Sequence, residues 1–428
     1  MLFNQTLTYI SLFSGAGVGC YGFLEEGFEC IATNETLEKR LNIQRINNKC
    51  KFDEGYICGD IKELEIKEKI LKRIEFYSKN FGNDRVDLVV ATPPCQGMSV
   101  ANHKKKNDEI KRNSLVIESV DLIKQIKPRF FILENVPSFY KTGCIDKNDN
   151  LLEIGTMIEQ NLSGDYRLYD EVINFKNFGA NSSRTRTLVI GVCKEFKDFV
   201  SALEFFPDFK EEKTLKEVIG SLKPLTWGEY DSTDFYHSFR TYPKHMQEWI
   251  KDLKEGQSAF ENVQDAISDL AYLCSNEGAF ESDYLNPIQS SYQALMRKNS
   301  PKLYNHQATN HSQAALEKLK LINKEQGKEC LPKNLHGKQQ FKSTWGRLNW
   351  NKISPTIDTR FDTPSNGTNS HPELHRSITP REAARIQSFS DDYIFYGNKT
   401  SVCKQIGNAV PPLLALALGK AILKNLRK

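Results

Sequence analysis

Several features that would place this chain in a specialised class are missing from its 428 residues. It has no run of about 18 apolar residues, so no membrane-spanning helix and no membrane partner are expected. Its ten cysteines include no Cys-x-x-Cys pair and its eight histidines are dispersed, so neither a disulfide framework nor a metal site is predicted. The first ten residues lack the basic-then-apolar layout of a secretory leader. We therefore expect a reducing, cytoplasmic setting.

Strong charge and phosphate-loop signals are also absent. The net charge of +4 does not by itself indicate a nucleic-acid partner, although it permits one if the basic residues share a face. The Gly-Lys-Ser/Thr pattern of a phosphate loop does not occur, which disfavours a nucleoside triphosphate. We find neither an internal repeat nor a low-complexity tract. With 39% hydrophobic and 26% charged residues, the chain has the composition of a globular protein of two or three domains.

Apolar strands alternate with amphipathic helices over residues 8 to 195. Helices are expected at Ile61–Lys79 and Leu115–Ile126. The predicted strands are Tyr9–Phe13, Glu29–Thr33, Val86–Val90, Phe130–Leu133 and Thr187–Val192. This alternation predicts an α/β fold with a mostly parallel sheet and helices on both faces. Ligands of such sheets lie beyond the carboxyl ends of the strands.

The pattern changes after about Lys194. From Phe196 to about Lys342 the periodicity is weak and aromatic, Lys, Asn and Ser residues are frequent, which indicates a separate, irregular domain. Regular structure returns at Thr379, predicted to cap a helix that has Pro380 in its first turn. A final helix with an apolar face is expected from Pro411 to Leu426.

Three features follow three successive strands of the first region. The first strand leads into Ser14-Gly15-Ala16-Gly17-Val18-Gly19, whose glycines allow close approach of the backbone to a ligand. Glu35 ends the second strand, and Asp60-Ile61 follow a short Tyr56-Ile57-Cys58 strand. A glycine-rich turn alone is a weak signal, and either acid alone is more often a helix cap or a solvated charge. Together they predict a site for a nucleoside-containing cofactor, with an acid that accepts bonds from ribose hydroxyls.

Cys95 follows two prolines that end an apolar strand, so it is presented on a stiff turn. A lone cysteine there is more often a small buried residue beside a turn, so a catalytic role requires the rest of a site elsewhere in the chain. Glu134 ends the apolar strand Phe130–Leu133, where partial desolvation would raise its pKa and suit it to proton donation. It could instead cap the next helix. Arg184 and Arg186 alternate onto one face, where they could clamp an anion, orient Glu134 or lie on a solvated edge.

Six motifs in order resemble the C5-cytosine DNA methyltransferase family. They cover roughly residues 8–195 and 344–428. The motifs are Ser11-Leu12-Phe13-Ser14-Gly15-Ala16-Gly17, Pro93-Pro94-Cys95-Gln96, Glu134-Asn135-Val136, Arg184-Thr185-Arg186, Thr379-Pro380-Arg381-Glu382-Ala383-Ala384-Arg385 and Gly407-Asn408-Ala409-Val410-Pro411-Pro412. Thr92 departs from the family pattern, which has Gly there, and Asn181-Ser182 stand where the family has Pro and Gln.

The resemblance implies a Rossmann-like methyltransferase sheet that uses S-adenosylmethionine to methylate cytosine in double-stranded DNA. The target base would leave the stack, and Cys95 as thiolate would attack its C6. Glu134 would lie at N3 of the cytosine. Arg184 and Arg186 would hold the cytosine and the Glu134 carboxyl in position. The cofactor pocket would comprise Phe13, Gly15, Gly17, Glu35, Asp60, Ile61, Pro94, Leu115, Asn408 and Val410.

The resemblance also implies a domain organisation and partners. Residues 1–196 would be the catalytic and cofactor-binding domain, 197–345 a smaller target-recognition domain, and 346–428 a segment returning to the first. The basic run His103-Lys104-Lys105-Lys106 would close over the DNA backbone as well as being a solvated loop. A cognate restriction endonuclease acting on the same site is a further partner implied by the family. We expect a monomer.

Three alternatives stay open. A catalytically silent nucleic-acid-binding relative is disfavoured by the intact Cys95, Glu134 and Arg186. A tRNA cytosine-5 methyltransferase of the same fold is disfavoured by the large middle region. A Rossmann-type oxidoreductase is disfavoured because the Pro-Pro-Cys turn would have no role in one. The spacing of the glycines in this chain also fits the dinucleotide-binding pattern poorly.

Overall fold

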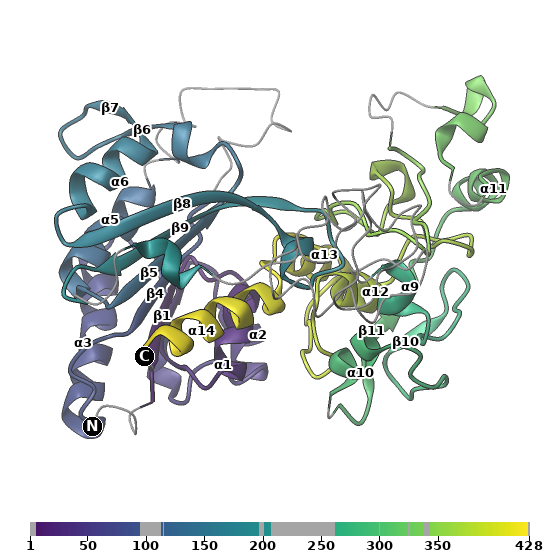
Figure 1. Ribbon diagram of the computed structural model, residues 1–428. Helices are drawn as coiled ribbons and strands as arrows, with labels where there is room; N and C mark the ends of the chain where they lie inside the picture. Colours follow the sequence, from purple (N-terminus) through teal and green to yellow (C-terminus); the bar gives the residue numbers. More distant parts are fainter. Residues whose placement is uncertain are drawn as a thin grey trace, which may run out of the picture. The chain divides into compact units, whose positions relative to one another are not determined.

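The structure is a computed structural model. It describes residues 6–94, 113, 115–196, 201–206, 262–298, 300–323, 326–336 and 343–426 (Figure 1). Cys95 and the basic run after it lie outside these residues. The chain forms two compact units. Unit 1 comprises residues 1–174, 185–208 and 409–428, and unit 2 comprises residues 175–184 and 209–408.

Unit 1 contains a seven-stranded sheet in the order β3-β2-β1-β4-β5-β9-β8. Its strands are β1 Thr8–Leu12, β2 Glu29–Glu35, β3 Tyr56–Cys58, β4 Leu88–Ala91, β5 Phe130–Asn135, β8 Tyr166–Asn174 and β9 Thr185–Cys193. Neighbouring strands from β3 to β5 are parallel, and β9 runs antiparallel to both β5 and β8. The predicted α/β class with a mostly parallel sheet is confirmed. Strand β8 was missed, because half-exposed charged residues interrupt its apolar pattern.

Helices cover both faces of this sheet, as predicted. Helices α3, α5 and α6 share one hydrophobic core, which includes Ile70, Val120 and Ile158, and Figure 1 shows α5 and α6 together on one side. On the other side α1 packs against α14. The helices are α1 Tyr21–Glu25, α2 Glu38–Ile46, α3 Leu64–Phe81, α5 Leu115–Ile126, α6 Ile154–Leu162 and α14 Pro412–Leu426. A hairpin of β6 Gly143–Ile145 and β7 Leu151–Glu153 precedes α6.

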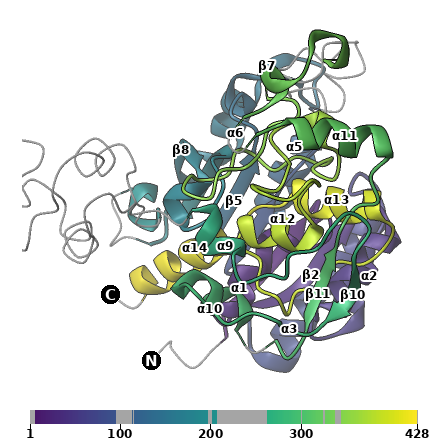
Figure 2. The same cartoon turned by 90° about the vertical axis from the view of Figure 1, so that its right-hand side faces the viewer.

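Unit 2 is less regular, with one antiparallel strand pair among its described residues, β10 Gly278–Ser282 and β11 Leu303–Gln307 (Figure 2). Its helices are α9 Val263–Ile267, α10 Ser291–Arg297, α11 Gln313–Leu321, α12 Pro380–Ile386 and α13 Lys399–Gly407. The predicted cap of α12 is present, because the Thr379 side chain accepts from the amide of Glu382 and Glu382 returns a bond to Thr379. Three arginines around this helix, Arg376, Arg381 and Arg385, are fully buried.

The two units divide the chain differently from the three parts expected from sequence. Residues 346–428 do not stay together, since Asn408 ends the last segment of unit 2 and Ala409 begins the last segment of unit 1. Residues 175–184 belong to unit 2, although in the sequence they connect β8 to β9, two strands of the unit 1 sheet. The functional assignment of these parts stays a prediction.

By length and composition, one helical stretch at residues 399–426 could span a membrane, with a mean hydropathy of 1.6. It is not one continuous helix, because residues 408–411 separate α13 from α14. In addition, 61% of its most apolar window is buried inside the protein. An interrupted and mostly buried stretch is typical of core helices, so it is weak evidence for a membrane span.

Candidate active site

A glycine-rich turn follows β1, and its backbone takes the left-handed conformation at Phe13, Gly15 and Gly17, with φ of 54°, 56° and 84°. The turn closes through a bond from the Gly17 amide to the Ser14 carbonyl, 2.8 Å long. A Cβ atom at Gly17 would lie 2.6 Å from Cγ of Gln44, so a larger side chain does not fit. Glycine is thus required at residue 17 for both its φ and its close packing.

Glu35 at the end of β2 holds this turn from the neighbouring strand. Its Oε2 accepts from the Gly15 amide at 3.0 Å. Its Oε1 accepts from the amides of Thr36 and Leu37, the Thr36 hydroxyl and Arg40. The side chain is 5% exposed, and Oε2 retains a lone pair for a further donor. Such an oxygen could accept a bond from a ligand hydroxyl.

Asp60 and Ile61 follow β3, the next strand of the sheet. Asp60 is exposed and its Oδ1 accepts from the Lys62 amide at 3.0 Å, whereas Ile61 is buried in the unit 1 core. Because β1, β2 and β3 are adjacent and parallel, the three features predicted as one rim do lie along one edge of the sheet.

A carboxylate–guanidinium pair lies across β5 and β9. Glu134 Oε1 is 3.1 Å from Arg186 Nε, and the two side chains are 12% and 16% exposed. The antiparallel register brings them together, since Glu134 lies opposite Leu188 and Asn135 opposite Thr187. A partly buried carboxylate that a guanidinium holds in place can form a hydrogen bond with the polar edge of a ring. The raised pKa predicted for Glu134 stays a prediction.

Two side chains connect the Pro-Pro turn to the rest of the site. Asn135 Nδ2 donates to the Pro93 carbonyl at 2.9 Å, which joins it to the end of β5. The Thr92 hydroxyl donates to the Phe13 carbonyl at 3.0 Å, which joins it to the glycine-rich turn. Thr92 and Pro93, which precede Pro94 and Cys95, are therefore anchored to the glycine-rich turn and to β5. Neither Asn135 nor Thr92 was predicted to be a site residue. Asn135 lies inside the motif that begins at Glu134, and Thr92 directly precedes the Pro-Pro-Cys motif.

Arg184 has different partners from Arg186, and the shared face expected from alternation stays a prediction. Arg184 precedes β9, belongs to unit 2 and is 7% exposed. Its Nη1 donates to the carbonyls of Ile357 and Gly407. Neighbouring Ser183 donates its amide to the Ser354 carbonyl at 3.0 Å, so this segment is fixed to residues 354–357 of the same unit.

The remaining predicted pocket residues are distributed over both units. Half-buried Pro94 ends the described part of the Pro-Pro turn, and half-buried Leu115 begins α5. Val410 packs on the helical turn after the glycines, since a Cβ at Gly19 would lie 3.0 Å from Val410 Cβ. Asn408 follows α13 in unit 2, and its amide donates to the Lys404 carbonyl.

No group of three His, Cys, Asp or Glu side chains suited to a metal ion occurs in the part of the chain that the structure describes. The described ionisable residues at the sheet edge include Glu35 with its partner Arg40, Asp60 and the Glu134–Arg186 pair.

Comparison with known proteins agrees with this geometry. The family model for C-5 cytosine-specific DNA methylase matches residues 7–424. The type II methyltransferase M.DdeI of Desulfomicrobium norvegicum is 28% identical, with 97% of this chain and 88% of that protein covered. The type II methyltransferase M1.HphI of Haemophilus parahaemolyticus is 26% identical, with 99% and 88% covered.

A solved structure shares the fold. An E. coli prophage-encoded protein described as a DNA modification methyltransferase superposes with a TM-score of 0.64 at 21% identity, over 99% of this chain and all of that one. The family match spans both units and includes the glycine-rich turn, the Pro-Pro turn and the Glu134–Arg186 pair. The chain therefore belongs to the C-5 cytosine-specific DNA methylase family and is a DNA cytosine-5 methyltransferase.

Proposed function

We propose that this chain transfers a methyl group from S-adenosylmethionine to C5 of one cytosine within a specific sequence of double-stranded DNA. The observation that carries the proposal is the Glu134–Arg186 pair, joined through Asn135 to the turn that leads into Cys95. This arrangement provides an acid, a cation and a stiff support for a nucleophile within one local framework.

The cofactor site in this proposal is the sheet edge formed by β1, β2 and β3. The Gly15–Glu35 bond leaves Oε2 able to accept from a ribose hydroxyl, and the left-handed turn exposes its backbone to a ligand. S-adenosylmethionine supplies an electrophilic methyl group when bound. The proposed pocket residues are Phe13, Gly15, Gly17, Glu35, Asp60, Ile61, Pro94, Leu115, Asn408 and Val410.

The target cytosine leaves the base stack, because its C5 and C6 are out of reach within the duplex. The Cys95 thiolate attacks C6 and forms a covalent bond. Glu134 donates a proton toward N3, which makes C6 more electrophilic. The bond from sulfur to C6 moves the electron pair of the C5–C6 double bond into an enamine whose C5 is nucleophilic, and C5 takes the methyl group as S-adenosylhomocysteine leaves. Arg186 orients the carboxyl through its 3.1 Å contact. After transfer, loss of the C5 proton and elimination of Cys95 restore the enzyme. Arg184 helps to hold the target base in this proposal, and its own side chain donates to the carbonyl of Gly407.

The remaining parts follow from the same proposal. Residues 197–345 form the target-recognition domain, whose polar side chains read base edges in the major groove. The lysines at 104–106 bind backbone phosphates without reading sequence. The protein acts as a cytoplasmic monomer and protects its site from a cognate restriction endonuclease.

Covalent trapping tests the mechanism. A DNA duplex carrying 5-fluorocytosine at the target position lacks the C5 proton, so turnover stops at the adduct and a denaturation-resistant complex should form with the wild-type chain. Cys95→Ser should form none and transfer no methyl groups, while still binding DNA. Glu134→Gln should lower the rate by roughly 100-fold or more, the contribution of a positioned general acid.

Two outcomes would contradict the proposal. Full methylation by Cys95→Ser would remove the nucleophile assignment. An adduct with 5-fluorocytosine in tRNA but not in duplex DNA would favour the RNA-modifying alternative. Bisulfite sequencing of DNA from cells expressing the chain would identify the methylated cytosine.

A further inference from the structure

Gln44 lies directly beneath the glycine-rich turn. It is on α2, its side chain is 1% exposed, and its Nε2 donates twice to the turn. One bond reaches Ser14 Oγ and the other the Gly15 carbonyl, both at 2.8 Å. The aliphatic part of the same side chain fills the space that a Cβ at Gly17 would need. Gln44 thus supports the turn by both hydrogen bonds and packing.

Lys49 determines which way the Gln44 amide points. The buried Lys49 ammonium can only donate, and it lies 3.0 Å from Ser11 Oγ and 3.3 Å from Thr33 Oγ1. The Thr33 hydroxyl accepts from Lys49, so its own proton goes to Gln44 Oε1 at 2.7 Å. A flipped amide would bring its NH₂ group against that hydroxyl proton. The amide nitrogen must therefore face the turn.

The chain of bonds continues to the neighbouring strands. Ser14 Oγ accepts from Gln44 and donates to the Asn34 carbonyl at 3.0 Å. Asn34 in turn donates to the carbonyls of Ile57 and Gly59, at 3.1 Å each. One directional series of bonds therefore joins the ends of β1, β2 and β3, the three strands that carry the candidate cofactor residues.

We propose that Gln44, oriented by Lys49 through Thr33, is a positioning residue for the cofactor turn. It sets the affinity for S-adenosylmethionine while contributing nothing to the reacting atoms. The inference rests on the proposed function, because it takes the glycine-rich turn as the cofactor site. A turn held in its binding conformation before the ligand arrives binds more tightly than one that must be ordered on binding.

Gln44→Glu is the direct test, since it keeps the shape of the side chain and removes both donors to the turn. An acceptor oxygen would then face the Gly15 carbonyl. We expect the KM for S-adenosylmethionine to rise about tenfold or more, in proportion to two lost hydrogen bonds. We expect kcat at saturating cofactor and the KM for DNA to change by less than about twofold, because the bonds exist equally in ground and transition states.

The matched control is Asn42→Asp, the same amide-to-acid change on the exposed face of α2. It should leave both KM values unchanged. Ser14→Ala is a second test, because it removes one bond from the turn side and leaves the buried groups around Lys49 intact. It should raise the KM for S-adenosylmethionine in the same direction, by a smaller factor than Gln44→Glu.

The outcomes separate the two proposals. Binding of S-adenosylmethionine to the wild-type chain, measured by calorimetry, tests the cofactor assignment alone, and its absence would remove the proposed function. If the wild-type chain binds and neither Gln44→Glu nor Ser14→Ala weakens binding, the positioning role is wrong and the proposed function stands. If Gln44→Glu is unfolded by circular dichroism, the Ser14→Ala result decides. A fall in kcat without a change in KM would also overturn the inference.

Discussion

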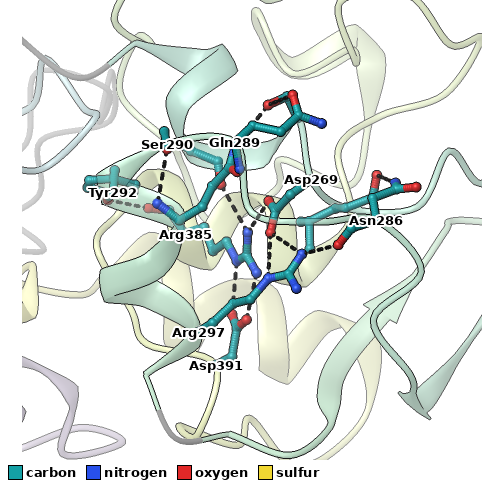
Figure 3. A network of polar contacts seen from close by, with 12 residues as sticks. Asp269, Asn286, Gln289, Ser290, Tyr292, Arg297, Arg385 and Asp391 are labelled. Carbon is teal, nitrogen blue, oxygen red and sulfur yellow. Dashed lines mark hydrogen bonds and ion pairs between the residues drawn. The ribbon is translucent and has the colours of Figure 1, made fainter.

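A network of buried charges in unit 2 centres on Arg385, which is fully buried (Figure 3). Its Nε and Nη2 donate to the two oxygens of Asp391 at 2.9 and 2.6 Å, and its Nη1 donates to Asp269. Burial acts to lower the pKa of Arg385, but the charges of Asp391 and Asp269 outweigh it and raise that pKa. Asp269 also accepts from Arg297 at 2.8 Å. Each charge therefore depends on its partners for compensation.

Asp269→Asn should destabilise unit 2 strongly. It removes a negative charge shared by Arg385 and Arg297, and leaves buried positive charge without full compensation. Breaking one partner of such a network costs about 3–5 kcal/mol. Urea unfolding followed by fluorescence should show the loss as a lower midpoint.

Asp283→Asn is the control at the same scale. Asp283 pairs with Lys302 at 2.6 Å, but its side chain is 72% exposed. An exposed pair contributes at most about 1 kcal/mol. If both variants shifted the midpoint equally, burial would not be the source of the network's importance.

At the scale of elements, the close approach of α1 and α14 requires glycine at residue 22. A Cβ atom built on Gly22 would overlap the Pro412 carbonyl oxygen and the backbone nitrogen of Leu416. Both overlaps are with backbone atoms, which cannot rotate away. The packing of the last helix on the first is therefore set by the absence of a side chain at residue 22.

Gly22→Ala should force the two helices apart and lower the stability of unit 1 by about 1–3 kcal/mol, the usual cost of overpacking. Thermal unfolding measures this as a lower Tm. Gly164→Ala is the matched substitution, because a Cβ at Gly164 meets nothing within 4 Å. An equal loss in both variants would contradict the packing argument.

At the scale of the whole molecule, stability should depend on pH through His371. The side chain is buried, and its Nδ1 accepts from the amides of Glu373 and Leu374. Burial lowers its pKa from 6.5 to about 4, with Arg376 acting in the same direction and Glu382 against it. Protonation of Nδ1 would break both bonds.

The folded chain should lose stability as the pH falls from about 6.5 to about 4. In that window His371 is neutral when folded and takes up a proton when unfolded, so acid favours the unfolded state. One such group contributes at most about 1.4 kcal/mol per pH unit. Denaturant unfolding at several pH values should show a shallower slope in His371→Asn, which keeps an acceptor and removes the titration.

Local features of the fold were predictable because their causes are local. The short strand at Tyr56–Cys58 and the helix at Leu115–Ile126 have the predicted bounds, since turn residues and apolar periodicity define them. Strand β8 escaped prediction because half-exposed charged residues interrupt its apolar pattern. The cap at Thr379 was likewise readable from a few adjacent residues.

The sequence by itself determined the family, the α/β class and the order of the motifs along the chain, because these depend on residue types and their spacing. Only the tertiary structure decided which residues meet. The register of β5 and β9 pairs Glu134 with Arg186. The fold of unit 2 brings the Arg184 side chain to the carbonyls of Ile357 and Gly407, to which it donates hydrogen bonds. The tertiary structure also placed Gln44 under the glycine-rich turn. Such contacts join residues that are far apart in the chain, so strand order and register fix them, and no local pattern contains that information.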